Sequence, residues 1–115
     1  DKQIKLNAAV QALDGKKADQ ITVIDLDGRT SVARYFIIAS GTSQTHLRAL
    51  RNALNELWQQ RFGHKLLNKS PQDSAWQVVD ANEIVVHLFT AEERERYNLE
   101  ALWGDAKQVK VALSA

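Results

Sequence analysis

Three consecutive small residues, Gly41-Thr42-Ser43, stand between an apolar run and a long amphipathic stretch, and they are the first candidates for chemistry. Backbone N–H groups at the start of a helix form a ready site for an anion such as phosphate. A simpler interpretation is an N-cap, in which Thr42 or Ser43 satisfies the free N–H groups of the helix that follows. The stretch is too short for a P-loop, which needs Gly-x-x-x-x-Gly-Lys before a Ser or Thr. We therefore favour the N-cap.

A similar turn occurs in nucleotidyltransferases, which hold Mg²⁺ with a pair of acids on a following strand. Here the strands that follow offer Asp80 alone, whereas Asp25 lies on an earlier strand. The three histidines lack the spacing of a zinc site. His87 lies in the middle of an apolar strand, where a hydrogen-bonded structural imidazole is more common than a catalytic base. These residues favour no metal, no cofactor and no catalysis, and they leave a nucleotide binder built on Gly41-Thr42-Ser43 with Asp25 or Asp80 as the rival hypothesis.

The spacing of apolar residues predicts an α/β fold, a mixed β-sheet with helices packed on it. Residues 3–13 have the period of an amphipathic helix, which Gly15 can end in the left-handed conformation. A longer helix is expected from Ser43 to about Phe62. Strands are expected at residues 21–26, 33–40, 65–68, 76–80 and 84–89, the last two as an antiparallel hairpin. Because residues 35–39 are all apolar, their strand should be central and buried on both faces.

The most informative stretch is residues 84–104, which read IVVHLFTAEERERYNLEALWG. Its strand ends at Thr90, and Glu93 follows three residues later, as in a capping box that begins a helix. Residues 92–96 carry charges of both signs, which usually form a solvated helix face. Their position beside Tyr97 also suits a binding site, because Trp, Tyr and Arg dominate the hot spots of protein interfaces.

The helix that Thr90 begins contains a conflict. Leu99, Leu102 and Trp103 form one apolar stripe, whereas Tyr97 lies about 200° around a helix from Leu99. Either the helix breaks near Asn98, or Tyr97 and the stripe face opposite sides and one of them points outward. We favour Tyr97 as the outward residue, which predicts a binding surface there.

Composition limits the function classes. The chain has 115 residues, 44% hydrophobic and 25% charged, which suits one domain over residues 1–115. A net charge of +1 gives no strong electrostatic case for nucleic acid, and the chain has no cysteine for disulfide or thiol chemistry. No apolar run approaches the roughly 18 residues of a membrane span. The chain begins at Asp1 without a Met, so the possibility of a removed targeting peptide stays open.

Long motifs carry a family resemblance. They read WQVVD at residues 76–80, VHLF at 86–89 and ERERYNLEALW at 93–103, and the run YFII before Gly41-Thr42-Ser43 agrees with them. With these motifs the chain resembles the ribosomal silencing factor family, also called iojap, over about residues 4–104. The C-terminal motif is the longest and the most specific of them.

The resemblance implies a nucleotidyltransferase-like fold that has lost catalysis and needs no cofactor. It implies a translation repressor that binds the large ribosomal subunit through large-subunit protein fourteen and sterically blocks joining of the small subunit. It also implies a homodimer when free, at most minor contact with rRNA, and a bacterial cytoplasmic location. Organelle members assist assembly of the large subunit, so a large-subunit assembly factor is the alternative. The residues expected at the partner surface are Trp76, Arg94, Tyr97, Leu99, Glu100 and Trp103, of which Leu99 and Trp103 suit a core equally well.

Two positions depart from the family pattern. The family usually has Thr-Asp where Ala33-Arg34 stand, and Glu-Gly where Lys69-Ser70 stand. Both changes replace an acid with a base. Contacts made by those acids are therefore not carried over to this chain.

Overall fold

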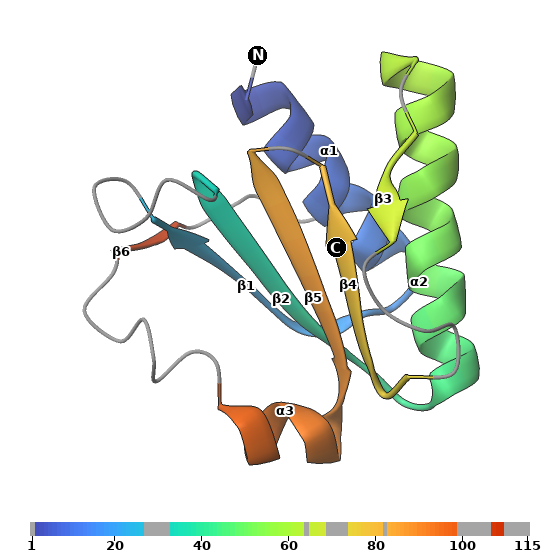
Figure 1. Cartoon of the computed structure of the whole chain (residues 1–115), viewed down its shortest axis with the longest axis vertical. Coiled ribbons are helices and arrows are strands. Elements are labelled where there is room, and N and C mark those ends of the chain that lie inside the picture. The colour runs from blue at the N-terminus through green and yellow to red at the C-terminus, as the bar shows by residue number, and fades with distance from the viewer. Residues whose placement is uncertain are drawn as a thin grey trace.

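A computed structural model describes residues 2–26, 33–63, 65–68, 74–81, 83–98 and 107–109 of the chain (Figure 1). The helices and strands in chain order are α1 (Lys2–Gly15), β1 (Asp19–Asp25), β2 (Tyr35–Gly41), α2 (Gln44–Leu57), η1 (Trp58–Phe62), β3 (Leu67–Asn68), β4 (Trp76–Asp80), β5 (Ile84–Thr90), α3 (Ala91–Tyr97) and β6 (Lys107–Val109). In this part of the chain no helix has the length and apolar character that a membrane span requires.

The described strands form one six-stranded sheet in the order β3-β4-β5-β2-β1-β6. At its centre β2 and β5 run parallel, in a register that extends from Tyr35 opposite Ile84 to Gly41 opposite Thr90. The other pairs are antiparallel, including the predicted hairpin of β4 and β5. The predicted α/β class, a mixed sheet with helices packed on it, is confirmed.

The two central strands are buried on both faces of the sheet. Successive side chains of a strand point to opposite faces, so Val86 and Leu88 of β5 face one way and Val85 and Phe89 the other. All four are at most 7% exposed. The expectation that residues 35–39 belong to a central strand is confirmed, because β2 lies between β5 and β1.

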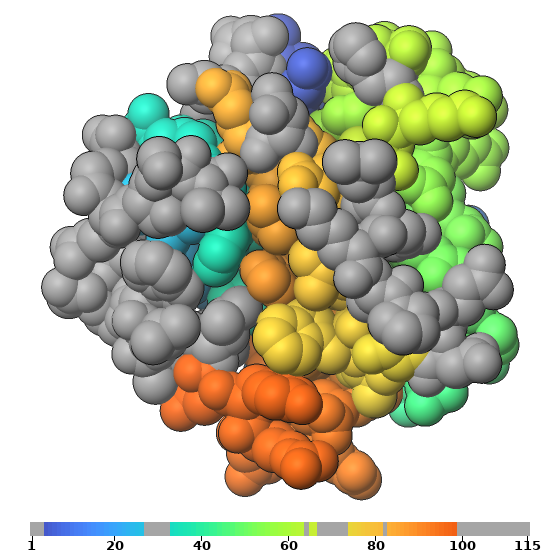
Figure 2. Space-filling model, in the orientation of Figure 1, coloured from blue at the N-terminus to red at the C-terminus, as the bar shows by residue number. Residues whose placement is uncertain are grey.

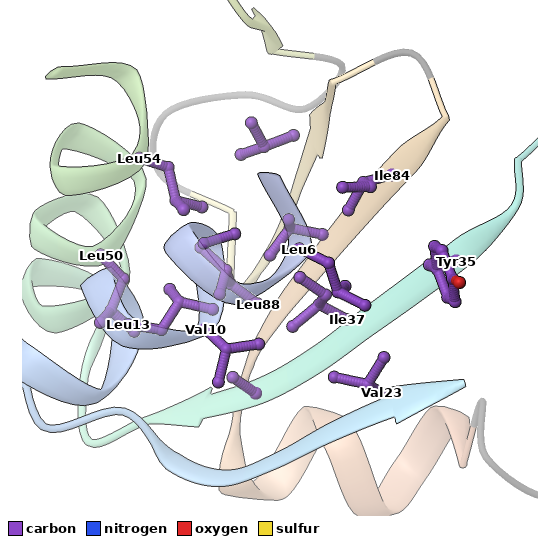
Figure 3. Packing of buried hydrophobic residues seen from close by; sticks show 14 of the residues in the cluster. Leu6, Val10, Leu13, Val23, Tyr35, Ile37, Leu50, Leu54, Ile84 and Leu88 are labelled. Atoms are coloured by element: carbon purple, nitrogen blue, oxygen red, sulfur yellow. The ribbon is translucent and has the colours of Figure 1, made fainter. Parts of the chain in front are cut away.

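The first face of the sheet is covered by α1 and α2, which pack against it through their apolar stripes (Figure 3). The members of this core on the two helices are Leu6, Ala9, Val10, Leu13, Leu47, Leu50 and Leu54. The predicted spacing of both helices is thus confirmed. The second helix reaches Phe62 as expected, with η1 as a π-helical continuation, and Gly63 ends it at φ 71°.

One expected helix end differs in detail, and the structure decides between the two alternatives left open for the other. After α1 the left-handed residue is Lys17, at φ 64°, rather than Gly15. The helix after Thr90 ends at Tyr97, because Asn98 adopts φ 45° and ψ 53° and stops it. Asn tolerates this conformation better than most residues. The alternative of a continuous helix through residue 104 is therefore wrong, and the break near Asn98 is what the structure shows.

The turn between β2 and α2 generates a test of packing. A Cβ added to Gly41 would lie 2.7 Å from Leu47 Cδ2 and 3.2 Å from His46 Nδ1. Leu47 is fully buried and has little room to move. We expect Gly41→Ala to destabilise the fold by about 1–3 kcal/mol through overpacking.

Gly15→Ala is the matched control, because nothing lies within 4 Å of its added Cβ. It should leave the urea midpoint unchanged or raise it, since Ala is the better helix former. Equal midpoints for the two variants would contradict the packing described at Gly41.

Candidate partner-binding surface

Aromatic rings gather on the second face of the sheet, opposite the core of α1 and α2. Trp76 of β4 pairs with Phe89 of β5, and their ring centroids lie 5.0 Å apart at an interplanar angle of 25°. His87, two residues before Phe89, has its ring 5.9 Å from that of Trp76. Tyr97 of α3 completes the group, 4.7 Å from Trp76. We call Trp76, His87, Phe89 and Tyr97 the aromatic cluster.

The position of Tyr97 follows from the short connection between β5 and α3. Thr90 is the last residue of the strand and also the N-cap, where its Oγ1 accepts a hydrogen bond from the Glu93 N–H at 3.5 Å. The helix starts at the next residue, so its last turn stays close to the start of β4, where Trp76 lies opposite Phe89. Tyr97 keeps 49% of its surface exposed. Figure 2 shows atoms of β4 and α3 side by side at the surface on this face.

Arg94 holds α3 against the sheet. Its Nη1 donates to the Gln20 carbonyl at 2.6 Å and to Ser40 Oγ at 3.0 Å, and its Nη2 donates to Thr22 Oγ1 at 3.0 Å. Gln20 presents that carbonyl from a β-bulge, at φ 49°. Arg94 is only 7% exposed. These contacts make Arg94 a residue that positions α3, and its place at a partner surface stays a prediction.

His87 is a buried structural imidazole, as its place in the strand predicts. The Trp76 Nε1–H donates to His87 Nδ1 at 3.1 Å, so the proton of the neutral ring is on Nε2. The Phe36 and His87 rings pack in a T-shaped arrangement, with centroids 4.6 Å apart. Burial lowers the pKa of His87 from 6.5 to about 4. The imidazole is therefore neutral at physiological pH and remains an acceptor for Trp76.

Of the six residues predicted at a partner surface, the structure brings Trp76 and Tyr97 together. Leu99, Glu100 and Trp103 lie outside the described residues. Sequence reasoning missed His87 and Phe89 as neighbours of Trp76. The signal was present, because alternation along β5 puts both on one face and the hairpin register places Phe89 opposite Trp76.

The turn at Gly41-Thr42-Ser43 is a helix cap. The Ser43 Oγ accepts from the His46 N–H at 3.1 Å, which confirms the N-cap interpretation. The Thr42 N–H donates to His46 Nδ1 at 2.9 Å, and His46 Nε2–H donates to the Lys16 carbonyl at 2.8 Å. The Thr42 and His46 N–H groups at this helix start are thus already used inside the fold.

With this geometry in place, the comparisons with known proteins decide the family. Residues 1–115 match the family model described as ribosomal silencing factor during starvation. The chain belongs to this family. A ribosomal silencing factor from Halalkalibacterium halodurans is 34% identical over 106 residues, which span 92% of this chain and 91% of that protein.

Two further relatives of this chain extend the comparison. A mouse protein named mitochondrial assembly of ribosomal large subunit protein 1 is 33% identical over 103 residues, 85% of this chain and 44% of that protein. A crystal structure of a protein from Chromobacterium violaceum matches with a TM-score of 0.85 at 28% identity, over 100% of this chain and 95% of that one. The fold is therefore that of solved relatives.

One departure from the family pattern has a local explanation. Arg34 donates through Nε to Asp25 Oδ1 at 3.0 Å, and its guanidinium lies 5.2 Å from the centroid of the Tyr35 ring. Asp25, one of the two acids considered for metal binding, is thus neutralised by an arginine. No group of three potential metal-ligating side chains occurs among the described residues. Lys69-Ser70, the other departure, lies outside them.

The burial of His87 predicts how stability depends on pH. The pKa of His87 is about 4 in the folded state and 6.5 as its ordinary value, so the unfolded chain binds more protons between these values. The stability that depends on a neutral His87 is fully present above pH 6.5 and is lost as the pH falls to 4. The shift corresponds to roughly 3 kcal/mol.

The measurement is the free energy of urea unfolding at pH 7 and pH 4 for the wild type and His87→Leu, which cannot titrate at this position. The wild type should lose more stability than the variant on acidification, by an amount on the order of the full shift. Parallel losses in the two proteins would contradict the burial of a neutral His87.

Proposed function

We propose that this silencing factor binds the large ribosomal subunit through the aromatic cluster and its surroundings, and that it blocks joining of the small subunit by occupying the contact face. The observation that carries the proposal is Tyr97, half-exposed beside Trp76 at the end of a rigid sheet. The proposed target on the subunit is large-subunit protein fourteen, which the family resemblance implies. The mechanism is steric occlusion without a catalysed reaction.

The aromatic cluster has the physical properties of an interface centre. Large rings bury much apolar area for few rotatable bonds, and Trp and Tyr are enriched among residues that dominate binding energy. Here the rings are held before a partner arrives, since Trp76 stacks on Phe89 and α3 is anchored through Arg94. Preorganisation of this kind reduces the entropy lost on binding.

The proposed contacts divide into two sets. Trp76 and Tyr97 touch the partner directly, and Arg94 supports them by holding α3. Leu99, Glu100 and Trp103 follow directly in sequence after α3, and we retain them as proposed contacts.

A homodimer is the proposed state of the free protein. An exposed aromatic group that belongs to a binding surface is an aggregation liability when no partner is present. A second copy of the chain that covers Tyr97 removes this liability and competes with the ribosome for the same surface.

A second candidate function is a role in assembly of the large subunit. It is favoured by the mouse relative, which is named for assembly of the ribosomal large subunit. Both candidates require binding to the large subunit, and they differ in whether the bound particle is mature. The nucleotide-binding hypothesis is less well supported, because the Thr42 N–H and the Asp25 carboxylate are already engaged within the fold.

Binding is tested by co-sedimentation of the protein with isolated large subunits, small subunits and joined ribosomes. We expect retention by large subunits. Tyr97→Ala should weaken this retention roughly thirtyfold or more, because truncation of a binding hot spot costs about 2 kcal/mol. The urea midpoint of the variant should change little.

Ile4→Ala is the matched control, because Ile4 is 50% exposed, like Tyr97 at 49%, but lies on α1. It should bind as the wild type does. Retention by small subunits alone would overturn the proposed function, and equal retention of the two variants would move the binding surface away from Tyr97.

Occlusion is tested by the order of addition. When large subunits are incubated with the protein first, we expect slower and weaker joining to small subunits in light scattering. Addition after joining should have much less effect, since the contact face is then already covered. Equal inhibition in both orders would argue for a mechanism other than steric occlusion.

A further inference from the structure

We propose that His87 is a positioning residue of the binding surface, which fixes the Trp76 indole beside Tyr97 and consumes its N–H group. A partner then meets the apolar rings of Trp76 and Tyr97 and no hydrogen-bond donor from the indole. The inferred chemistry of the partner rests on the proposed function. The orientation of the Trp76 indole is a property of the free protein and is measured separately.

Two interactions of different kinds constrain the indole. Stacking on Phe89, with centroids 5.0 Å apart, fixes the plane of the Trp76 ring. Stacking alone does not fix which edge of the ring points where, because the terminal torsion of Trp has broad, roughly two-fold preferences. The hydrogen bond from Trp76 Nε1–H to His87 Nδ1 at 3.1 Å selects one of these orientations. In that orientation the ring centroids of Trp76 and Tyr97 are 4.7 Å apart.

His87 is held by its place in the sheet and by ring packing rather than by a second hydrogen bond, since its buried Nε2 has no hydrogen-bond partner among the described residues. It is paired with Val78 of β4 on one side and with Ile38 of β2 on the other, in the interior of the sheet. The Phe36 ring packs against the imidazole in a T-shaped arrangement, with centroids 4.6 Å apart. With 7% of its surface exposed, the side chain has few alternative rotamers. The acceptor atom therefore has a defined place before any partner binds.

The consequence is a selectivity for partner chemistry. Because the indole N–H is already paired, a partner that offers a carbonyl or carboxylate at this point gains no hydrogen bond and pays for the desolvation of its acceptor. A partner that offers aliphatic side chains gains the burial of apolar area on two rings. We infer that the protein surface recognised at Trp76 is aliphatic, and that polar contacts lie around it rather than on it.

The experiment compares His87→Leu, which has no acceptor, with His87→Asn, whose Oδ1 can stand near the position of Nδ1. In ¹⁵N-labelled wild-type protein, we expect a scalar coupling across the hydrogen bond between Trp76 Nε1 and His87 Nδ1. In His87→Leu the nuclear Overhauser contacts between the Trp76 and Tyr97 rings should weaken, and in His87→Asn they should persist. Absence of the coupling in the wild type overturns the proposal even where a variant fails to fold.

Binding to large subunits supplies the second readout. His87→Leu should weaken binding roughly tenfold, the effect of about 1.4 kcal/mol, and His87→Asn should stay within about threefold of the wild type. In a Trp76→Phe background, which has no indole N–H to hold, His87→Leu should have little further effect. An equal loss in both backgrounds would overturn the positioning role. A wild-type protein that does not bind large subunits overturns the proposed function, while the ring contacts still decide the role of His87.

Discussion

The parallel pairing of β2 with β5 is the constraint on which the rest of the structure depends. Because the two strands run in the same direction, they end at the same edge of the sheet, with Gly41 opposite Thr90. The helix α2 begins just beyond the first of these residues and α3 directly after the second. Both strands are also buried on both faces, so one face receives α1 and α2 while the other carries the aromatic cluster.

Arg94 connects α3 to β1, the strand that pairs antiparallel with β2. Its guanidinium reaches Ser40 near the end of β2 and the bulge of β1, so α3 is fixed to two strands besides the one that it follows. A buried arginine needs such partners, because an unpaired charge away from water is costly. The cost is met here by a carbonyl and two hydroxyl groups. The result is a short helix with little freedom to change its angle, which keeps Tyr97 next to Trp76.

The fold class and most helices and strands can be predicted from the sequence, because each of the patterns has one physical explanation. The unbroken apolar run at residues 35–39 requires burial on both faces, and the leucines of α2 have a period that only a helix satisfies. The proposed partner surface is harder to predict from the sequence, because it depends on contacts between residues that are distant in the chain. Trp76 and Tyr97 can be selected by type, yet their contact depends on the short connection at Thr90 and on the bulge at Gln20 that receives Arg94. A residue type such as Arg does not reveal whether its guanidinium faces inward or outward.

We propose that the face carrying Trp76 and Tyr97, rather than the helical face, meets the large subunit. The direct test is a cryo-electron microscopy structure of purified large subunits with this protein bound. This binding mode predicts that Trp76 and Tyr97 lie within van der Waals contact, about 4 Å, of a large-subunit protein on the face that meets the small subunit. It also predicts that α1 and α2 point away from that protein. Density in which α1 and α2 form the contact, or in which the protein sits away from the joining face, would contradict this binding mode.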